Sequence, residues 1–266
     1  MHHRSEASPI PAASRLSLRN VRKSFPGKPP LLALDGIDLD VEQGSFVSLV
    51  GPSGCGKSTL LYMIGGLLPV DGGQIIDNGR LVTGPGPQRG MVFQEFALFP
   101  WLSVAKNIEF GLTLGTAATR WTRTAVQGRV TELINMVGLS GFEDKKPDQL
   151  SGGMKQRVAI ASCLATDPDV LLMDEPFGAL DAQTRLGMQR ELVRLYEQTH
   201  KTVVFVTHDI REAVLLSDQV VVLSRRPGVV KAVVPVNIPR PRAGTGVEFS
   251  AEFTSLTRQL SELLDG

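Results

Sequence analysis

The chain has 266 residues, enough for one large domain, and its 42% apolar and 21% charged residues are ordinary for a folded globular protein. Its 28 Lys and Arg residues nearly balance 27 Asp and Glu residues, so the net charge of +1 gives no electrostatic case for a nucleic-acid partner. No apolar run is long enough to span a bilayer, and a role at a membrane would require partner subunits. Cys55 and Cys163 are expected to be free thiols in a reducing compartment.

The N-terminal residues 1–14 are rich in Pro, Ala and Ser and lack the apolar core of a signal peptide, which predicts a mobile tail. Leu16–Phe25 and Ile37–Val41 then alternate apolar and polar residues. This alternation predicts a half-buried, antiparallel pair of strands. Phe46–Val50 is apolar almost throughout, as is typical of a strand covered on both faces.

A glycine-rich stretch follows this third strand. Its sequence GPSGCGKST matches the P-loop pattern and leads into a helix predicted over Ser58–Leu68. Converging backbone N–H groups and the positive end of a helix bind phosphate in such a loop. Lys57 is predicted to neutralise the β- and γ-phosphates of a bound nucleotide, and Ser58 to ligate Mg²⁺. The predicted nucleotide-binding residues are Gly51, Ser53, Gly54, Cys55, Gly56, Lys57, Ser58 and Thr59.

From about residue 95 to residue 166, strand-like runs are absent and apolar residues in Val126–Val137 recur at helical spacing. We expect a helical subdomain inserted here into an α/β body. Near its end, the sequence LSGGMKQR at Leu150–Arg157 places a second Ser-Gly-Gly turn before a helix. Ser151 is predicted to cap this helix, whose N–H groups and positive end favour phosphate.

Strands return at Val170–Met173, Val203–Val206 and Val220–Leu223, with a helix between the first two that begins after Asp181. Strand, helix and strand at this spacing predict crossover units and a parallel sheet. The predicted fold is therefore α/β: a P-loop NTPase with a mostly parallel core sheet, an N-terminal antiparallel β-subdomain and an inserted α-helical subdomain. Residues 225–266 are expected to form a C-terminal appendage that ends in a short helix.

Two acids end the predicted strand in VLLMDEP. Ligands of an open parallel sheet bind at the carboxyl ends of its strands. Asp174 is therefore placed to hold Mg²⁺, directly or through water, and Glu175 to act as the general base or water-orienting group for attack on the γ-phosphate. Such a pair is elsewhere usually a solvated strand end, but the P-loop favours the catalytic interpretation. His208, after the strand in VVFVTHD, could contact the γ-phosphate or be an ordinary surface histidine; spacing alone favours neither.

These motifs and their order resemble the ATP-binding cassette family over Leu16–Leu223. A P-loop alone occurs in many families, whereas the full order is specific. The resemblance implies a cassette domain over residues 15–224 with the helical subdomain at about 95–166. The matched features are the P-loop at Gly51, Gln94 in MVFQE, LSGG at Leu150, the acidic strand at Val170, GALD at Gly178 and THD at Thr207.

The resemblance also implies a reason for the second Ser-Gly-Gly turn. Two cassettes of this family form a head-to-tail dimer, and each ATP lies between one P-loop and the LSGG signature of the other chain. Ser151, Gly152 and Gly153 would then serve the partner's nucleotide. Asp181 would contact the partner chain, and His208 would clamp the γ-phosphate.

Further roles follow from the resemblance position by position. Gln94 would sense Mg²⁺ and the attacking water. Phe25 stands where the family often has a tyrosine stacked on adenine, and a phenyl ring can still stack. Met154 replaces the usual signature glutamine, and loss of one polar contact typically costs about 1 kcal/mol.

The sequence EFALFPWLSV after Gln94 resembles the surface that receives a helix of the membrane subunit. Phe96, Phe99 and Trp101 suit a docking groove, although each could equally fill the core. The stretches GPGPQRGMVFQ, LFPW, DEPFGALDAQTR and THDIREAV resemble importers of taurine, aliphatic sulfonates and nitrate. This likeness implies a peripheral subunit on the cytoplasmic side of the bacterial inner membrane, with permease subunits and, indirectly, a solute-binding protein as partners.

Other functions are disfavoured by what the sequence lacks. A soluble cassette ATPase for DNA maintenance would carry a long coiled-coil insertion between P-loop and signature, and the gap here shows no sustained heptads or basic stripe. A translation-associated protein would carry two cassettes, and a small-molecule kinase would have no use for LSGG or GALD. The solute, and whether the dimer pairs identical chains, stay open.

Overall fold

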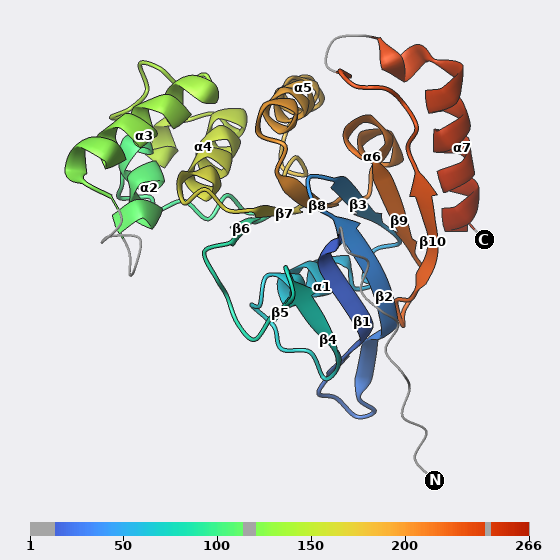
Figure 1. The fold of residues 1–266 in the computed structure, drawn as a ribbon. Coiled ribbons are helices and arrows are strands. Elements are labelled where there is room, and N and C mark those ends of the chain that lie inside the picture. Colours follow the sequence, from blue (N-terminus) through green and yellow to red (C-terminus); the bar gives the residue numbers. More distant parts are fainter. Residues whose placement is uncertain (1–13, 114–120, 243–245, 266) are drawn as a thin grey trace. The chain divides into compact units, whose positions relative to one another are not determined.

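The computed structural model of the protein describes residues 14–113, 121–242 and 246–265 (Figure 1). It divides into two compact units. The first comprises Met1–Pro85, Val206–Ile238 and Glu248–Gly266, and the second comprises Gly86–Phe205 and Pro239–Val247. The tail expected over residues 1–14 lies outside the described residues except for Ser14, which begins strand β1.

The first unit contains a four-stranded antiparallel sheet. Its strands are β1 (Ser14–Phe25), β2 (Leu31–Glu42), β4 (Gly72–Asp77) and β5 (Arg80–Leu81), in the order β2-β1-β4-β5. The antiparallel register of β1 and β2 confirms the predicted pairing of the first two strands. β2 also buries alternate residues over Ile37–Val41, as expected. The sequence analysis gave no strand at β4 or β5.

The first unit also contains the strand that leads to the P-loop. β3 (Phe46–Val50) is buried along its whole length and pairs in parallel with β9 (Gln219–Leu223). β10 (Val230–Pro235) pairs antiparallel with β9, in a region where the sequence analysis predicted no strand.

Helix α1 (Lys57–Ile64) follows the P-loop and ends four residues earlier than predicted. The reason is Gly66, which has a left-handed φ of 74°. A Cβ there would lie 2.2 Å from the carbonyl oxygen of Gly84, so the chain turns away from the helix axis at a position that only glycine fits.

Two helices of the first unit pack together near its C-terminus. α7 (Ala251–Asp265) lies beside α6 (Ile210–Leu216) and β10 (Figure 1). Phe253 of α7 is fully buried, and the Arg211 guanidinium of α6 lies 5.1 Å from the centre of its ring. The C-terminal helix is therefore part of the packed first unit.

In the second unit, strands β8 (Thr202–Val206), β7 (Val170–Asp174) and β6 (Arg89–Val92) lie in that order. β6 and β7 are parallel, and β8 ends at Val206, where the chain passes into the first unit. Helix α5 (Ala182–Thr199) connects β7 to β8 and buries its predicted apolar stripe. β7 and β8 are buried throughout, as expected for crossover strands.

Three further helices of the second unit cluster together: α2 (Val104–Phe110), α3 (Arg123–Met136) and α4 (Gly152–Ala165) (Figure 1). Short 3₁₀ segments occur at Gly111–Thr113 and Pro147–Gln149. Between residues 95 and 166, the described part of the chain contains no strand. Parallel strand pairs, an antiparallel N-terminal sheet and this helical cluster confirm the predicted α/β fold class.

Candidate functional site

The P-loop connects β3 to α1 and encloses the ammonium of Lys57. Lys57 is only 6% exposed, and its Nζ donates hydrogen bonds to the carbonyl oxygens of Gly51 (2.8 Å) and Pro52 (3.1 Å). Gly56 caps the helix in a left-handed conformation without a side-chain hydrogen bond. The first N–H groups of α1 and a fixed positive charge therefore lie in one loop, an arrangement that suits phosphate.

The other predicted P-loop residues divide by exposure. Ser53 and Gly54 are exposed, whereas Ser58 and Thr59 are half-buried in the first turn of α1. The thiol of Cys55 is buried, and this burial raises its pKa. The exposed part of the loop is available to a ligand, and the buried part anchors the loop.

A glycine outside the P-loop braces it. Gly228, in the turn between β9 and β10, is buried; a Cβ there would lie 2.3 Å from the Cys55 carbonyl oxygen and 2.9 Å from Leu34 Cδ2. Its N–H donates to Ala33 O (2.8 Å), and its carbonyl accepts from Asp35 N–H (3.1 Å). Gly228 thus lies between β2 and the P-loop. Sequence reasoning missed this contact, because the RRPG stretch indicates a turn but not its neighbour.

Phe25 is the last residue of β1 and pairs with Leu31 of β2. Its ring is half-buried, and Lys23 Nζ lies 5.8 Å from the ring centre. Lys23 in turn forms an ion pair with Asp71 at 2.8 Å. An accessible aromatic ring is present where the sequence analysis predicted adenine stacking.

His208 follows β8 and is exposed, whereas its neighbour Thr207 is 2% exposed. The Thr207 N–H donates to Leu49 O of β3 (3.3 Å), and its hydroxyl hydrogen-bonds the buried carboxylate of Glu212. Asp209 caps α6 by accepting from Arg211 N–H (2.8 Å) and Glu212 N–H (3.2 Å). These bonds hold the backbone on both sides of His208. Sequence reasoning missed Glu212, because a glutamate in a helix usually faces solvent.

Asp174 and Glu175 follow one another at the carboxyl end of β7. Asp174 is 1% exposed. Glu175 adopts a φ of 41°, in the left-handed region that non-glycine residues rarely occupy. Backbone strain of this kind is concentrated at functional sites, because the surrounding structure must maintain it.

Gln94 and Glu175 come together at Gly178. A Cβ on Gly178 would lie 3.8 Å from Glu175 Oε2 and 3.9 Å from Gln94 Nε2. The Gly178 N–H also closes a turn onto the Glu175 carbonyl at 3.0 Å. Two of the three predicted catalytic side chains therefore border the same backbone position in the second unit.

An aromatic loop over Phe99–Trp101 follows Gln94. Phe99 packs 4.4 Å from Phe110 and 5.5 Å from Trp101 between ring centres, and Trp101 is 67% exposed. Asn107, which is 4% exposed, accepts from Phe99 N–H (2.8 Å) and donates to the carbonyls of Phe99, Leu102 and Ser103 at 3.0–3.3 Å. Asn107 fixes this loop and has no sequence motif that marks it.

The signature end, Ser151–Gly153, begins helix α4. Ser151 and Gly152 are exposed, and the Ser151 hydroxyl accepts a hydrogen bond from Met154 N–H at 3.3 Å. The predicted N-cap is therefore present. The first-turn N–H groups of an α-helix have no acceptor within the helix, so this exposed end suits an anion.

Asp181 caps helix α5 from an exposed position and accepts from Thr184 N–H at 3.0 Å. Hydrogen bonds from the hydroxyl and the N–H of Thr184 hold the pKa of this carboxyl below its usual value. The candidate residues thus form two sets: Phe25, the P-loop and His208 belong to the first unit, and Gln94, Asp174, Glu175, the signature end and Asp181 to the second.

The oxygen donors suit Mg²⁺ in the way that nucleotide enzymes bind it. The described residues contain no group of three or more acidic, His or Cys side chains that would form an all-protein metal cage. Mg²⁺ in such enzymes uses one or two carboxylates, water and substrate phosphates. Each unit contains one oxygen donor of this kind: the hydroxyl of Ser58 in the first unit and the buried carboxylate of Asp174 in the second.

A family model described as ABC transporter matches residues 34–178 of this chain. The chain belongs to the ABC transporter family. The family predicted from the order of motifs is thereby confirmed, and an ABC ATP-binding cassette binds ATP.

Curated relatives include import subunits of this family. The cassette is 46% identical to a putative ATP-binding protein of Brucella abortus (strain 2308) over 92% of each chain. It is 47% identical to the aliphatic sulfonates import ATP-binding protein SsuB of Bacillus cereus, over 81% of this chain and 83% of that protein. It is also 49% identical to the bicarbonate transport ATP-binding protein CmpC of Synechococcus elongatus, over 94% of this chain but 38% of that longer protein. These relatives agree with the predicted importer subfamily.

Solved structures of an ABC cassette have the same fold. The dimeric, post-hydrolysis structure of the cassette MJ0796 bound to ADP and Pi matches with a TM-score of 0.72 and 34% identity, over 84% of this chain and all of that one. A second dimeric structure of that cassette matches with a TM-score of 0.73. Within the described residues, no helix has the length and hydropathy required to cross a membrane.

Proposed function

We propose that this ABC cassette hydrolyses ATP as a head-to-tail dimer and thereby powers import of a small oxyanion through partner membrane subunits. The observation that carries the proposal is the signature end, Ser151–Gly153, of which Ser151 and Gly152 are exposed. The chain already has a complete P-loop around Lys57. A second exposed helix start with the same phosphate chemistry is explained if it meets the nucleotide of a partner chain.

The first unit supplies the residues proposed to bind ATP. Lys57 and the N–H groups of the P-loop bind the phosphates, and the half-buried ring of Phe25 stacks on adenine. Lys57 exchanges its present carbonyl acceptors for phosphate oxygens, which form stronger, charge-assisted hydrogen bonds. The exposed imidazole of His208 donates a hydrogen bond to the γ-phosphate.

The second unit supplies the groups proposed for hydrolysis. Glu175 accepts the proton of the water that attacks the γ-phosphate, so ADP and inorganic phosphate are the products. Gln94 orients that water, and its position beside Glu175 at Gly178 supports this role. The donors proposed for Mg²⁺ are Ser58, Asp174 and Gln94; the ion would neutralise phosphate charge.

ATP binding is proposed to close the dimer, and hydrolysis to reopen it. The γ-phosphate bound by one chain meets Ser151–Gly153 of the other, and Asp181 contacts the partner beside it. Cleavage removes the charged group that the signature end binds, so the interface loses its main electrostatic attraction. This cycle would drive the membrane subunits between two states.

The aromatic loop is the proposed docking surface for the membrane subunits. Trp101 is 67% exposed and its loop is fixed by Asn107, so a large apolar side chain is presented on a rigid support. Such aromatic residues are typical anchors of protein interfaces. The proposed location is accordingly peripheral, on the cytoplasmic side of the inner membrane.

The proposed solutes are sulfonate, taurine or nitrate, or a similar oxyanion. The support comes from relatives named for aliphatic sulfonate import and for bicarbonate transport. Selectivity would reside in the membrane subunits and a solute-binding protein, because none of the proposed site residues would touch the solute.

Copurification of the cassette with its membrane subunits tests this proposal. ATPase activity of the assembly in vesicles should rise when the solute-binding protein is loaded with one of these anions. The same measurement with the Glu175→Gln cassette should show no stimulated turnover. Salt-sensitive DNA binding without any stimulation by solute would instead support a DNA-maintenance ATPase.

A further inference from the structure

The N-terminal ends of helices α4 and α5 touch within one chain. A Cβ on Gly153 would lie 2.5 Å from the Cγ2 methyl of Thr184, closer than such atoms approach in proteins. A Cβ on Gly152 would lie 3.3 Å from Leu180 Cδ2. The signature end therefore rests directly on the start of α5, and its glycines permit this approach.

Thr184 uses both branches of its side chain. The methyl group faces Gly153, the Thr184 N–H donates to the carboxylate of Asp181 at 3.0 Å, and the hydroxyl helps to lower the pKa of that carboxylate. Asp181 and the signature end are the two surfaces that the proposed function assigns to the partner chain. One half-buried threonine connects them.

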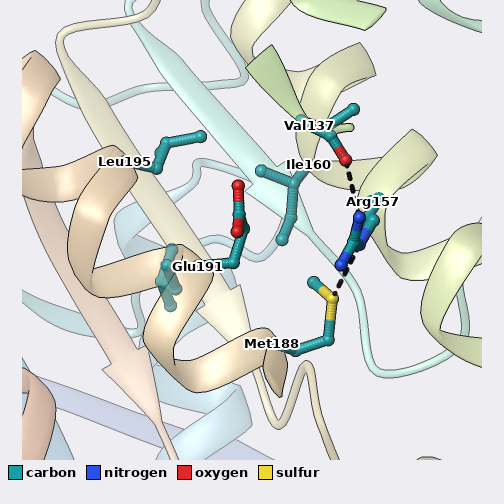
Figure 2. Close-up of a pocket in the computed structure, with 7 residues that line it drawn as sticks. Val137, Arg157, Ile160, Met188, Glu191 and Leu195 are labelled. Carbon is teal, nitrogen blue, oxygen red and sulfur yellow. Dashed lines mark hydrogen bonds between the residues drawn. The ribbon is translucent and has the colours of Figure 1, made fainter. Parts of the chain in front are cut away.

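One helical turn further, the same two helices are joined by Arg157 and Met188 (Figure 2). Arg157 Nε donates to Met188 Sδ at 3.4 Å, and its Nη1 donates to the carbonyl of Val137 at 3.1 Å. Residues 153 and 157 of α4 and residues 184 and 188 of α5 are each one turn apart. Thr184 and Arg157 thus make successive contacts along one helix pair.

A small space remains beside the contact of Arg157 and Met188. A small cavity of about 10 Å³ is lined by Val137, Arg157, Ile160, Met188, Glu191, Leu192 and Leu195 (Figure 2). It holds at most about one water molecule, so it is not a ligand pocket. Thr184 lies at the N-terminal end of this helix pair, where the two helices approach most closely at Gly153.

We propose that Thr184 is a positioning residue that holds the signature end and Asp181 in one arrangement, so that both reach the partner's nucleotide together. The inference rests on the proposed function, because it concerns the surfaces offered to a second chain. A threonine at this helix position also stabilises the helix start locally. A purely local role would affect folding stability alone, whereas the positioning role affects turnover at the partner's ATP.

Three variants separate the two branches of the side chain. Thr184→Ser keeps the hydroxyl and loses the methyl, Thr184→Val keeps the methyl and loses the hydroxyl, and Thr184→Ala loses both. We expect Thr184→Ala to lower kcat about fivefold, a typical coupling between contacting residues. Ser and Val should each recover part of that loss. The Kd for ATP of the monomeric cassette should stay near wild type, because Lys57 and its loop are untouched. Any decrease in Tm should be small enough to leave the protein folded at the assay temperature.

A mixing experiment shows on which chain Thr184 acts. An intact-P-loop cassette is mixed with a large excess of Lys57→Ala cassette, so that nearly every working P-loop faces the signature end of the excess chain. With Thr184→Ala on the excess chain, we expect the full fivefold loss of activity. With Thr184→Ala on the intact-P-loop chain, we expect the activity of the control without this substitution.

The outcomes distinguish the two hypotheses. Equal losses in both mixtures, or an unchanged kcat of Thr184→Ala alone, would overturn the role of Thr184 while leaving the dimer intact. The control mixture contains wild-type cassette and an excess of Lys57→Ala cassette. If its activity is only that of wild-type monomer, ATP is not shared between two chains. The proposed function then fails, and the Thr184 proposal fails with it. A decrease in Tm large enough to unfold part of the Thr184→Ala protein at the assay temperature would explain the lost activity by instability. That result would also count against the positioning role of Thr184.

Discussion

The P-loop and the signature end are both glycine-containing starts of helices, yet the structure treats them differently. The P-loop is packed on several sides: Lys57 bonds to its own carbonyls, Gly56 approaches Leu34, and Gly228 contacts Cys55. At the signature end, Ser151 and Gly152 are exposed. The P-loop is anchored on several sides within its own unit, whereas the signature end presents an exposed helix start.

This difference indicates how the two phosphate-binding regions divide the work. A rigid loop binds a nucleotide within one chain with little reorganisation. In the proposed function, the exposed helix start meets phosphate that another chain brings to it. Mutations at the P-loop should therefore affect the monomer, and mutations at the signature end should affect the dimer.

Glu175→Gln should have the largest effect on turnover. The amide preserves the shape of the side chain but cannot accept the proton of the attacking water, so kcat should fall about 10²–10⁴-fold. ATP binding should persist, and the γ-phosphate, which is no longer hydrolysed, should hold the dimer together. Steady-state ATPase assays and light scattering with ATP measure both effects; normal turnover would remove Glu175 from its role.

Ser151→Asp should lower turnover by placing a negative charge at the signature end. Aspartate caps helices as well as serine does, so the Tm should not fall. A negative charge beside the partner's γ-phosphate should nevertheless lower kcat by at least about tenfold, since like charges repel strongly at short range. Ser151→Asn is the uncharged control with the same capping ability. An ATP-dependent Ser151→Asp dimer would contradict the account.

Gly228→Ala should weaken the P-loop site without touching the signature end. The new methyl group would overlap the Cys55 carbonyl, and such overpacking costs about 1–3 kcal/mol in stability or local distortion. We expect weaker ATP binding by the monomer in calorimetry. Gly187→Ala is the matched control, because this exposed glycine of α5 has no atom within 4 Å of the added methyl. Equal ATP affinities would show that Gly228 does not brace the loop.

Asp71→Asn should have the smallest effect of these substitutions, and it should act on the free energy of unfolding. Hydrogen bonds from the ammonium of Lys23 and the N–H of Ser24 hold the pKa of the Asp71 carboxyl below its usual value. Its stabilising effect is therefore complete above the unfolded-state pKa and is lost as pH falls through the folded-state pKa. Because the side chain is 42% exposed, we expect less than about 1 kcal/mol. Denaturant titrations should show the difference from wild type shrinking from pH 7 toward acid.

The sequence predicted most of the fold because its signals were local. Each signal is carried by a few consecutive residues: the apolar run of β3, the capping residues Ser151 and Asp181, and the P-loop before α1. The family motifs also ordered the candidate residues. By contrast, β4 pairs with β1, which is distant in sequence, and neither β4 nor the hairpin strands β5 and β10 carry a strong apolar alternation.

Supporting residues of the site were beyond sequence reasoning for the same reason. Asn107 and Glu212 are polar residues in helices, a pattern that usually indicates a solvated face. Their burial arises because each satisfies backbone or side-chain groups of a nearby loop. Gly228 and Thr184 matter through contacts with Cys55 and Gly153, which lie far away in the sequence.

The central claim is that each ATP is shared by the P-loop of one chain and the signature end of another. Mixing Lys57→Ala and Ser151→Asp cassettes tests it most directly, since each variant alone lacks one half of every shared site. The mixed dimer regains one intact pair, so ATPase activity should rise well above that of either variant alone. A mixture no more active than its components would contradict the account, because it would place both halves on one chain.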